Sequence, residues 1–240
     1  MTPTPPITDR TTFQRNLTTL RPLEKAHTRT SDALATARRT LPMVSVPNIP
    51  LIGAAGPTTL LSAFESRSQL LIYIHMWTPG APFSSQCSGC TFFNGHVQEL
   101  SYLHSRGVTF ATLSAGPWEE ISAYREFLGL KMPWYHVDSD KIEDIADGVL
   151  VAYLRVGDEV FQTYATTGRG CEVMANSYGL LDLTVFGRQE VGETSPEGWP
   201  QGFGGKGGQW MVGGRPILQV GKGEEVKGDE AVGDDVEEKE

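Results

Sequence analysis

Cysteine is scarce in this sequence, with three residues of this type in 240. So small a number does not suggest the disulfide framework that stabilises small secreted domains. Long apolar runs are also lacking, since none approaches the roughly 20 residues that a membrane-spanning helix needs. The opening residues contain no apolar stretch of the kind found in a secretory signal peptide. We therefore expect a cytoplasmic protein in a reducing setting, with no membrane partner.

The sequence also has no excess of positive charge, because its formal net charge is −9. Residues 222–240 hold nine acidic residues and three lysines, a net charge of −6, which leaves −3 for residues 1–221. A nucleic-acid-binding surface would need a basic face, so we expect no nucleic-acid partner. The acidic, Gly-rich end has few large apolar residues and is predicted to be a disordered, solubilising tail.

The most informative stretch contains a Cys-x-x-Cys motif. Leu70–Trp77 is a continuous apolar run with the length of a buried strand, and the loop 78–86, which holds proline and glycine, ends it. Cys87-Ser88-Gly89-Cys90 follows. Beyond the motif, residues at helical spacing (Phe93, Val97, Leu100 and His104) predict one helix that ends at Gly107. The two cysteines are therefore expected where a strand and its loop lead into the N-terminus of a helix.

That position favours thiol chemistry. The first N–H groups of a helix have no partner within the helix, and the helix dipole places partial positive charge there. A thiolate is stabilised by this environment, so the pKa of its thiol falls. We predict Cys87 as the exposed attacking thiol and Cys90, three residues on, as the thiol that resolves the mixed disulfide.

Two other interpretations of the motif stay open. Structural zinc takes four ligands, and the sequence has only one further cysteine, Cys171, and no second Cys-x-x-Cys motif. The pair can also be two ordinary buried cysteines, since free cysteine is often buried. The strand–loop–helix context favours redox chemistry over both.

The remaining pattern alternates between strands and helices. Residues 12–40 predict helical structure that Pro22 divides into two helices or one broken helix. Pro57–Phe64 predicts a turn and a short helix, and Val108–Leu113 predicts a strand parallel to the first. A helix from Pro117 to Gly129 follows, then a hairpin around residues 156–159 and a last helix over residues 170–181.

This order predicts an α/β fold of the thioredoxin-like type, a sandwich with a mixed central sheet and flanking helices. We divide the chain into an N-terminal helical extension (1–50), a thioredoxin-like domain (51–190), and a Gly-rich segment with a disordered acidic tail (191–240). The Gly- and Pro-rich residues 187–221 contain Trp199, Phe203 and Trp210. Two alternatives stay open for them: they wrap onto the body through these aromatic residues, or they stay mobile.

Several motifs resemble a known family, the thioredoxin-like domain-of-unknown-function family DUF899, within the thioredoxin and peroxiredoxin fold group. The matching pieces are the leading helix ending RRTLPMVSV, then SQLLIYIHMW, CSGCTFFNGHV, VTFATLSAGPWEEISAYREFLGLKMPWYHVDSD, VFQTYATTGRG and LLDLTVFGRQE, which cover roughly residues 12–190 in the same order. The resemblance implies a thioredoxin-like fold. It does not imply a particular reaction.

Comparison with thioredoxins and peroxiredoxins suggests supporting residues, with departures. Thioredoxins carry Trp directly before the first cysteine, whereas here Gln86 has that position and Trp77 lies ten residues upstream. Ser84 matches the Thr or Ser that peroxiredoxins place three residues before their reactive cysteine. Pro133 is the candidate for the cis-proline that faces the disulfide in thioredoxins.

Charged and ionisable side chains supply further candidates. Arg169 and Arg125 are candidates for a cation beside the thiolate, and His96 is a candidate proton carrier. Cys171 is either a buried thiol or a third redox partner. The residues imply neither a cofactor nor a metal ion.

Three functions fit these observations. The first is a thiol-disulfide oxidoreductase, in which Cys87 attacks a substrate disulfide and Cys90 resolves the product. The second is a peroxidase, in which Cys87 is oxidised to a sulfenic acid that condenses with Cys90. The third is a non-redox protein that binds a small metabolite or a protein partner. For the first two, the expected partners are a disulfide or peroxide substrate and a thiol reductant. The oligomeric state stays open.

Overall fold

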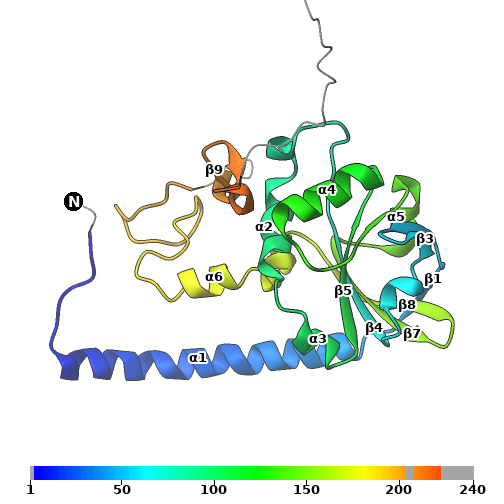
Figure 1. The fold of residues 1–240 in the computed structure, drawn as a ribbon. Helices are drawn as coiled ribbons and strands as arrows, with labels where there is room; N and C mark the ends of the chain where they lie inside the picture. Colours follow the sequence, from blue (N-terminus) through cyan, green and yellow to red (C-terminus); the bar gives the residue numbers. More distant parts are fainter. Residues whose placement is uncertain (1–2, 204–207, 223–240) are drawn as a thin grey trace, which may run out of the picture.

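An eight-stranded mixed sheet forms the centre of the computed structural model, which describes residues 3–203 and 208–222 (Figure 1). The strand order is β1-β8-β7-β4-β5-β6-β2-β3. Its strands are β1 (Val44–Val46), β2 (Pro50–Gly53), β3 (Gly56–Thr59), β4 (Gln69–Ile74), β5 (Val108–Ser114), β6 (Trp134–His136), β7 (Leu150–Val156) and β8 (Glu159–Thr166). A separate two-stranded sheet contains β9 (Met211–Val212) and β10 (Arg215–Pro216). The helices are α1 (Arg10–Arg39), α2 (Ser88–His96), α3 (Ser101–His104), α4 (Trp118–Leu128), α5 (Ser139–Ile145) and α6 (Asn176–Leu181).

The central strands run in mixed directions. β4 pairs in parallel with β5 and antiparallel with β7, β6 continues the parallel part beside β5, and β7 and β8 form an antiparallel hairpin. The strand that leads to the cysteines therefore lies at the centre, with a parallel crossover on one side and the hairpin on the other. This arrangement confirms the predicted α/β, thioredoxin-like fold.

Alternating side chains of β4 supply two cores, one on each face of the sheet. Leu70 and Ile72 pack on one face with Phe64, which lies in a short 3-10 turn, and with Ile145 of α5. Tyr73 points to the other face, which α2 and α4 cover. Because helices cover both faces, β4 and β5 are apolar along most of their length, as the sequence suggested.

Three local predictions are wrong. The expected turn and helix over Pro57–Phe64 is instead strand β3, which pairs with β2 around Gly56 at φ +92°, followed by the 3-10 turn. The helix expected to reach Gly107 ends at His96, where the Gln98 side chain bonds to the Gly95 carbonyl oxygen, and α3 forms separately. The last helix is divided at Ala175 into a 3-10 stretch, Gly168–Met174, and α6.

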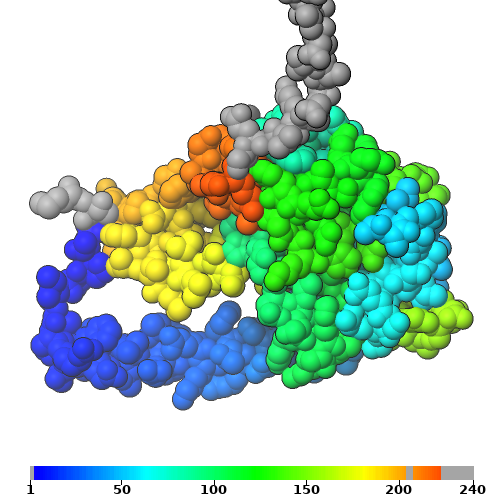
Figure 2. Space-filling view, viewed as in Figure 1, coloured from blue at the N-terminus to red at the C-terminus, as the bar shows by residue number. Residues whose placement is uncertain are grey.

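The expected break at Pro22 is also wrong, because α1 is one helix of 30 residues. Asp9 caps it by accepting the N–H of Thr12 at 2.9 Å. None of its residues is buried, so the carbonyl group that Pro22 leaves without a donor can bond to water. The helix extends beyond the sheet, and open space separates it from the segment that contains α6 (Figure 2).

No helix in the described part of the chain combines the length and apolar character needed to cross a membrane. The predicted disordered tail lies outside the described residues, apart from its first residue, Lys222.

Candidate functional site

The two cysteines lie at the N-terminus of α2, as predicted. Cys87 is the N-cap residue, and its sulfur accepts the backbone N–H of Cys90 at 3.3 Å. Cys87 is half-buried, whereas Cys90 is buried within the first turn. The two thiols therefore differ in access to solvent in the way that an attacking and a resolving thiol require.

Their pKa values differ as well. The hydrogen bond from the Cys90 thiol, together with the backbone N–H groups of Cys90 and Gly89, lowers the pKa of Cys87 to about 7 against the effect of burial. The same hydrogen bond to Cys87, and then burial, hold the pKa of Cys90 well above its usual range. Near neutral pH, Cys87 is thus partly a thiolate and Cys90 is the neutral thiol that donates to it.

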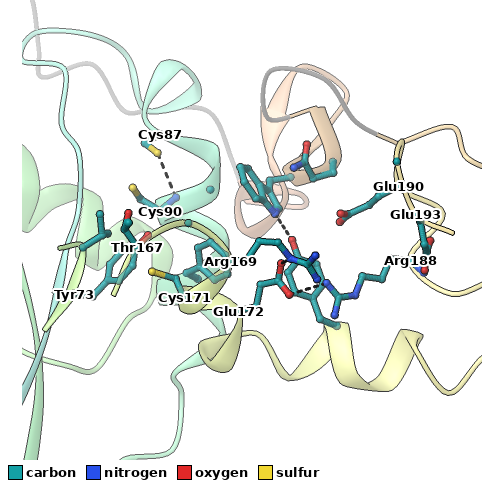
Figure 3. Close-up of a pocket in the computed structure, with 18 of the residues that line it drawn as sticks. Tyr73, Cys87, Cys90, Thr167, Arg169, Cys171, Glu172, Arg188, Glu190 and Glu193 are labelled. Carbon is teal, nitrogen blue, oxygen red and sulfur yellow. Dashed lines mark hydrogen bonds and ion pairs between the residues drawn. The ribbon is translucent and has the colours of Figure 1, made fainter. Parts of the chain in front are cut away.

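Tyr73 and Cys171 lie on the inner side of this pair (Figure 3). The Tyr73 side chain is buried and hydrogen-bonds to the Cys90 sulfur. Cys171 is buried in the same core cluster, and burial raises the pKa of its thiol. All three thiols line one cavity. Whether Cys171 takes part in redox chemistry stays a prediction.

The cavity has a volume of about 760 Å³, which suits a small organic molecule or a short peptide. Around the cysteines its wall is mainly apolar and aromatic, with Tyr73, Phe93, Val149 and Trp210. Its other end is polar and contains two arginines and four carboxylates: Arg169, Arg188, Glu172, Asp182, Glu190 and Glu193. The reactive sulfur therefore faces a cavity with two chemically different ends.

Part of that wall comes from the Gly-rich segment, for which the sequence left two alternatives open. Its residues 208–222 pack against α2. A Cβ atom on Gly89 would lie 2.8 Å from the Trp210 ring, and one on Gly95 would lie 2.8 Å from Leu218, so both glycines allow close approach. Gln219 is fully buried. These residues therefore wrap onto the body.

The polar end is organised by Arg188, a residue that the sequence analysis missed. Its guanidinium donates to both carboxylate oxygens of Asp182, at 2.9 and 2.8 Å, and to Glu172 at 3.0 Å. It also lies 4.1 Å from the centre of the Tyr178 ring. Since Arg188 follows α6 in a stretch without a periodic pattern, only the three-dimensional structure identifies it.

A second set of contacts joins the two ends of the cavity. The Trp210 indole N–H donates to the Tyr178 hydroxyl at 2.7 Å, and that hydroxyl hydrogen-bonds to Glu190. Burial raises the pKa of the Glu190 carboxyl. The aromatic wall and the acidic end are thus fixed relative to each other.

Two of the predicted supporting residues lie near the motif. Trp77 is half-buried, and its indole N–H donates to Glu120 at 2.8 Å. The same carboxylate accepts the backbone N–H of Gly80, so it holds the loop before the cysteines. Ser84 lies in the 3-10 turn Phe83–Ser85, which immediately precedes Gln86 and Cys87.

His96 lies away from the sulfurs. It is the last residue of α2, about 13 Å from Cys87 along the helix at a rise of about 1.5 Å per residue. Its ring nitrogens bond to the Phe92 carbonyl oxygen and to the Ser177 hydroxyl. This position does not suit a proton carrier for Cys87.

Pro133 does not have the expected conformation, because no peptide bond in the described residues is cis. Its carbonyl oxygen accepts the N–H of Thr112 and so takes part in the pairing of β5 with β6. Val149, which lies just before β7 on the opposite side of β4, lines the cavity instead. The cis-proline prediction is therefore wrong.

The two candidate arginines are both engaged elsewhere. Arg169 lines the cavity, but its side chain is 88% exposed and pairs with Glu172 at 2.9 Å. Arg125 donates to the carbonyl oxygens of Met132 and Lys131. Among the residues that the structure describes, no group of three or more His, Cys, Asp or Glu side chains is placed to hold a metal ion.

The chain belongs to a family described as bacterial protein of unknown function (DUF899), whose profile matches residues 2–146 and 144–211. No curated protein matches the chain. Among solved structures, it is similar to peroxidoxin BcpB from Mycobacterium tuberculosis, with 12% identity, a TM-score of 0.37, and coverage of 57% of this chain and 92% of that one. It is also similar to thioredoxin from Wuchereria bancrofti, with 17% identity, a TM-score of 0.36, and coverage of 55% and 88%.

Proposed function

We propose that this member of DUF899 is a thiol-disulfide oxidoreductase. The observation that carries the proposal is the arrangement at the start of α2, where the sulfur of Cys87 accepts a backbone N–H and a buried neutral thiol lies beside it. A thiolate held in this way attacks disulfides at neutral pH, and a second thiol three residues away can close a disulfide with it.

In the proposed reaction, the Cys87 thiolate attacks one sulfur of the substrate disulfide, and the other half leaves as a thiolate that takes a proton from water. Cys90 then loses its proton and attacks Cys87, which forms the Cys87–Cys90 disulfide and releases the second half as a thiol. The two electrons come from the cysteine pair. An external thiol reductant restores the pair and is oxidised to a disulfide.

The pKa values support this order of events. The contact with Cys87 is the main cause of the raised pKa of Cys90. Once Cys87 is covalently bound in the mixed disulfide, it carries no negative charge, so the Cys90 thiol ionises more readily. The resolving thiol is therefore activated only after the first step has taken place.

The proposal is tested by measuring the thiol states of the pair directly. We expect the rate of Cys87 alkylation by iodoacetamide to rise with pH through a midpoint near 7, because the thiolate fraction increases there. In graded thiol buffers, mass spectrometry should detect one reversible Cys87–Cys90 disulfide. Thiols that stay inert until the protein unfolds would contradict the proposal. Rapid consumption of hydrogen peroxide without disulfide reductase activity would instead support the peroxidase.

A further inference from the structure

We infer that the cavity beside Cys87 takes a small disulfide that carries a positively charged group, such as an ammonium or a guanidinium. The inference rests on the proposed function and specifies its substrate class. Residues 208–222 form a wall beside the reactive sulfur, so the sulfur faces a cavity. A small molecule or a flexible peptide can enter such a cavity more readily than a disulfide on the rigid surface of a folded protein.

The charges at the polar end favour a cation. Both arginines already pair with carboxylates there: Arg188 with Asp182 and Glu172, and Arg169 with Glu172. The described lining residues at this end therefore include two positively charged arginines and four carboxylates. The remaining two acids are Glu190 and Glu193, and they leave this end with an excess of negative charge.

Acceptor atoms without hydrogen-bond donors at this end of the cavity also favour a cation. Glu193 accepts the backbone N–H of Arg188 with Oε1, but its Oε2 atom is buried and has no hydrogen-bond partner among the described residues. The same holds for Oε1 of Gln209, which also lines the cavity. Buried acceptors without donors are unusual in folded proteins. An ammonium group offers three donors and a positive charge, which together match the carboxylates of Glu190 and Glu193 that line this end.

The aromatic wall suits the rest of such a substrate. Trp210 packs against Gly89 of the motif and donates to Tyr178, which hydrogen-bonds to Glu190. The Phe93 ring lies 5.9 Å from the Trp210 ring, so both rings can contact an apolar spacer. One sulfur of the substrate then bonds to Cys87 while the cation lies near Glu190 and Glu193. The electron and proton balance is that of the proposed reaction, in which the cysteine pair is oxidised and the substrate is reduced to two thiols.

The test uses three short disulfides that differ only in charge. They are the symmetrical disulfides of N-acetyl-Cys-Ala-Lys-amide, N-acetyl-Cys-Ala-Gln-amide and N-acetyl-Cys-Ala-Glu-amide. With the full-length protein, we expect kcat/KM for the lysine probe to exceed that for the glutamine probe about tenfold, a size typical of a charge-assisted contact, with the glutamate probe the slowest.

Two variants locate the effect. In the double variant Glu190→Gln and Glu193→Gln, which keeps shape but removes charge, the lysine-to-glutamine ratio should fall to below about twofold. Glu159→Gln, on the exposed end of β8, is the matched control and should leave the ratio unchanged. Equal kcat/KM values for all three probes in the wild-type protein would overturn the inference while the proposed function stands.

A second measurement separates the two claims, because it does not depend on turnover. Cys87 is modified with methanethiosulfonates that carry an aminoethyl, a methyl or a sulfonatoethyl group. Each rate is divided by the rate at which the same reagent modifies a free thiol in solution, which removes the intrinsic reactivity of the reagent. A preference for the aminoethyl reagent that the double variant loses would support the cation site even if no disulfide were reduced catalytically. Absence of that preference in the wild-type protein would overturn the inference on its own.

Discussion

Replacing Cys87 by serine is expected to lower kcat/KM for the reduction of 2-hydroxyethyl disulfide by at least about a thousandfold, the scale of losing an essential nucleophile. A serine hydroxyl is not ionised near neutral pH, so the helix N-terminus has no anion to stabilise. The wild-type thiol, with its pKa near 7, supplies a substantial thiolate fraction at pH 7.5. Initial rates with excess reductant measure the difference.

Replacing Cys90 by serine should have a different effect. The first attack still takes place, but the mixed disulfide persists, so the mass of the chain increases by one substrate half. Cys90→Ala, unlike Cys90→Ser, leaves no side-chain donor at this position, so it removes the main hydrogen bond that lowers the pKa of Cys87, and the alkylation midpoint should move to higher pH. This shift is a readout that a merely structural role of Cys90 would not produce.

Cys171→Ala is the matched control, because the proposed mechanism makes no use of that thiol. Full reductase activity in Cys87→Ser would show that the mechanism is wrong. Rapid turnover by Cys90→Ser, abolished when Cys171 is also replaced, would identify Cys171 as a second resolving thiol. Thermal unfolding of every variant separates loss of activity from loss of the fold.

The centre of the fold could be predicted because its signals are local. Leu70–Trp77 is apolar at nearly every position since both faces of the sheet are covered, and the loop and motif that follow are contiguous in sequence. Cys87 at the N-cap of α2 follows from that order alone. The same holds for β5 and α4, whose bounds lie within a few residues of the predicted ones.

The cavity could not be predicted, because its parts are distant in sequence and have no periodic pattern. Trp210 contacts Gly89 across more than a hundred residues, and Gly89 appears in the sequence only as the small residue of the motif. Arg188 and Glu190 lie in a Gly-rich stretch where neither helical nor strand spacing exists. Their role depends on ion pairs and burial, which a single sequence does not encode locally.

Replacing Gln219 by alanine tests how the Gly-rich segment is held against the body of the protein. Its side-chain N–H₂ group donates to the Phe83 carbonyl oxygen and to the Tyr124 hydroxyl, both at 2.8 Å. Phe83 belongs to the turn before Cys87, so one fully buried amide joins the segment to the loop that carries the reactive thiol. We expect the variant to lower the free energy of unfolding by about 2 kcal/mol, because two buried hydrogen bonds are lost and a gap is left.

Urea unfolding measures that loss, and hydrogen exchange followed by mass spectrometry locates it. Exchange should become faster in residues 208–222 and at the start of α2, while β4 and β5 change little. The matched control is Gln98→Ala, an exposed glutamine that bonds to the Gly95 carbonyl oxygen within its own turn and should change stability by less than about 0.5 kcal/mol. If both glutamine variants behaved alike, the wall of the cavity would not depend on this amide. A selective effect at Gln219 would show that the segment and the cysteine loop are held as one unit, so that substrate access to Cys87 and the stability of the C-terminal segment change together.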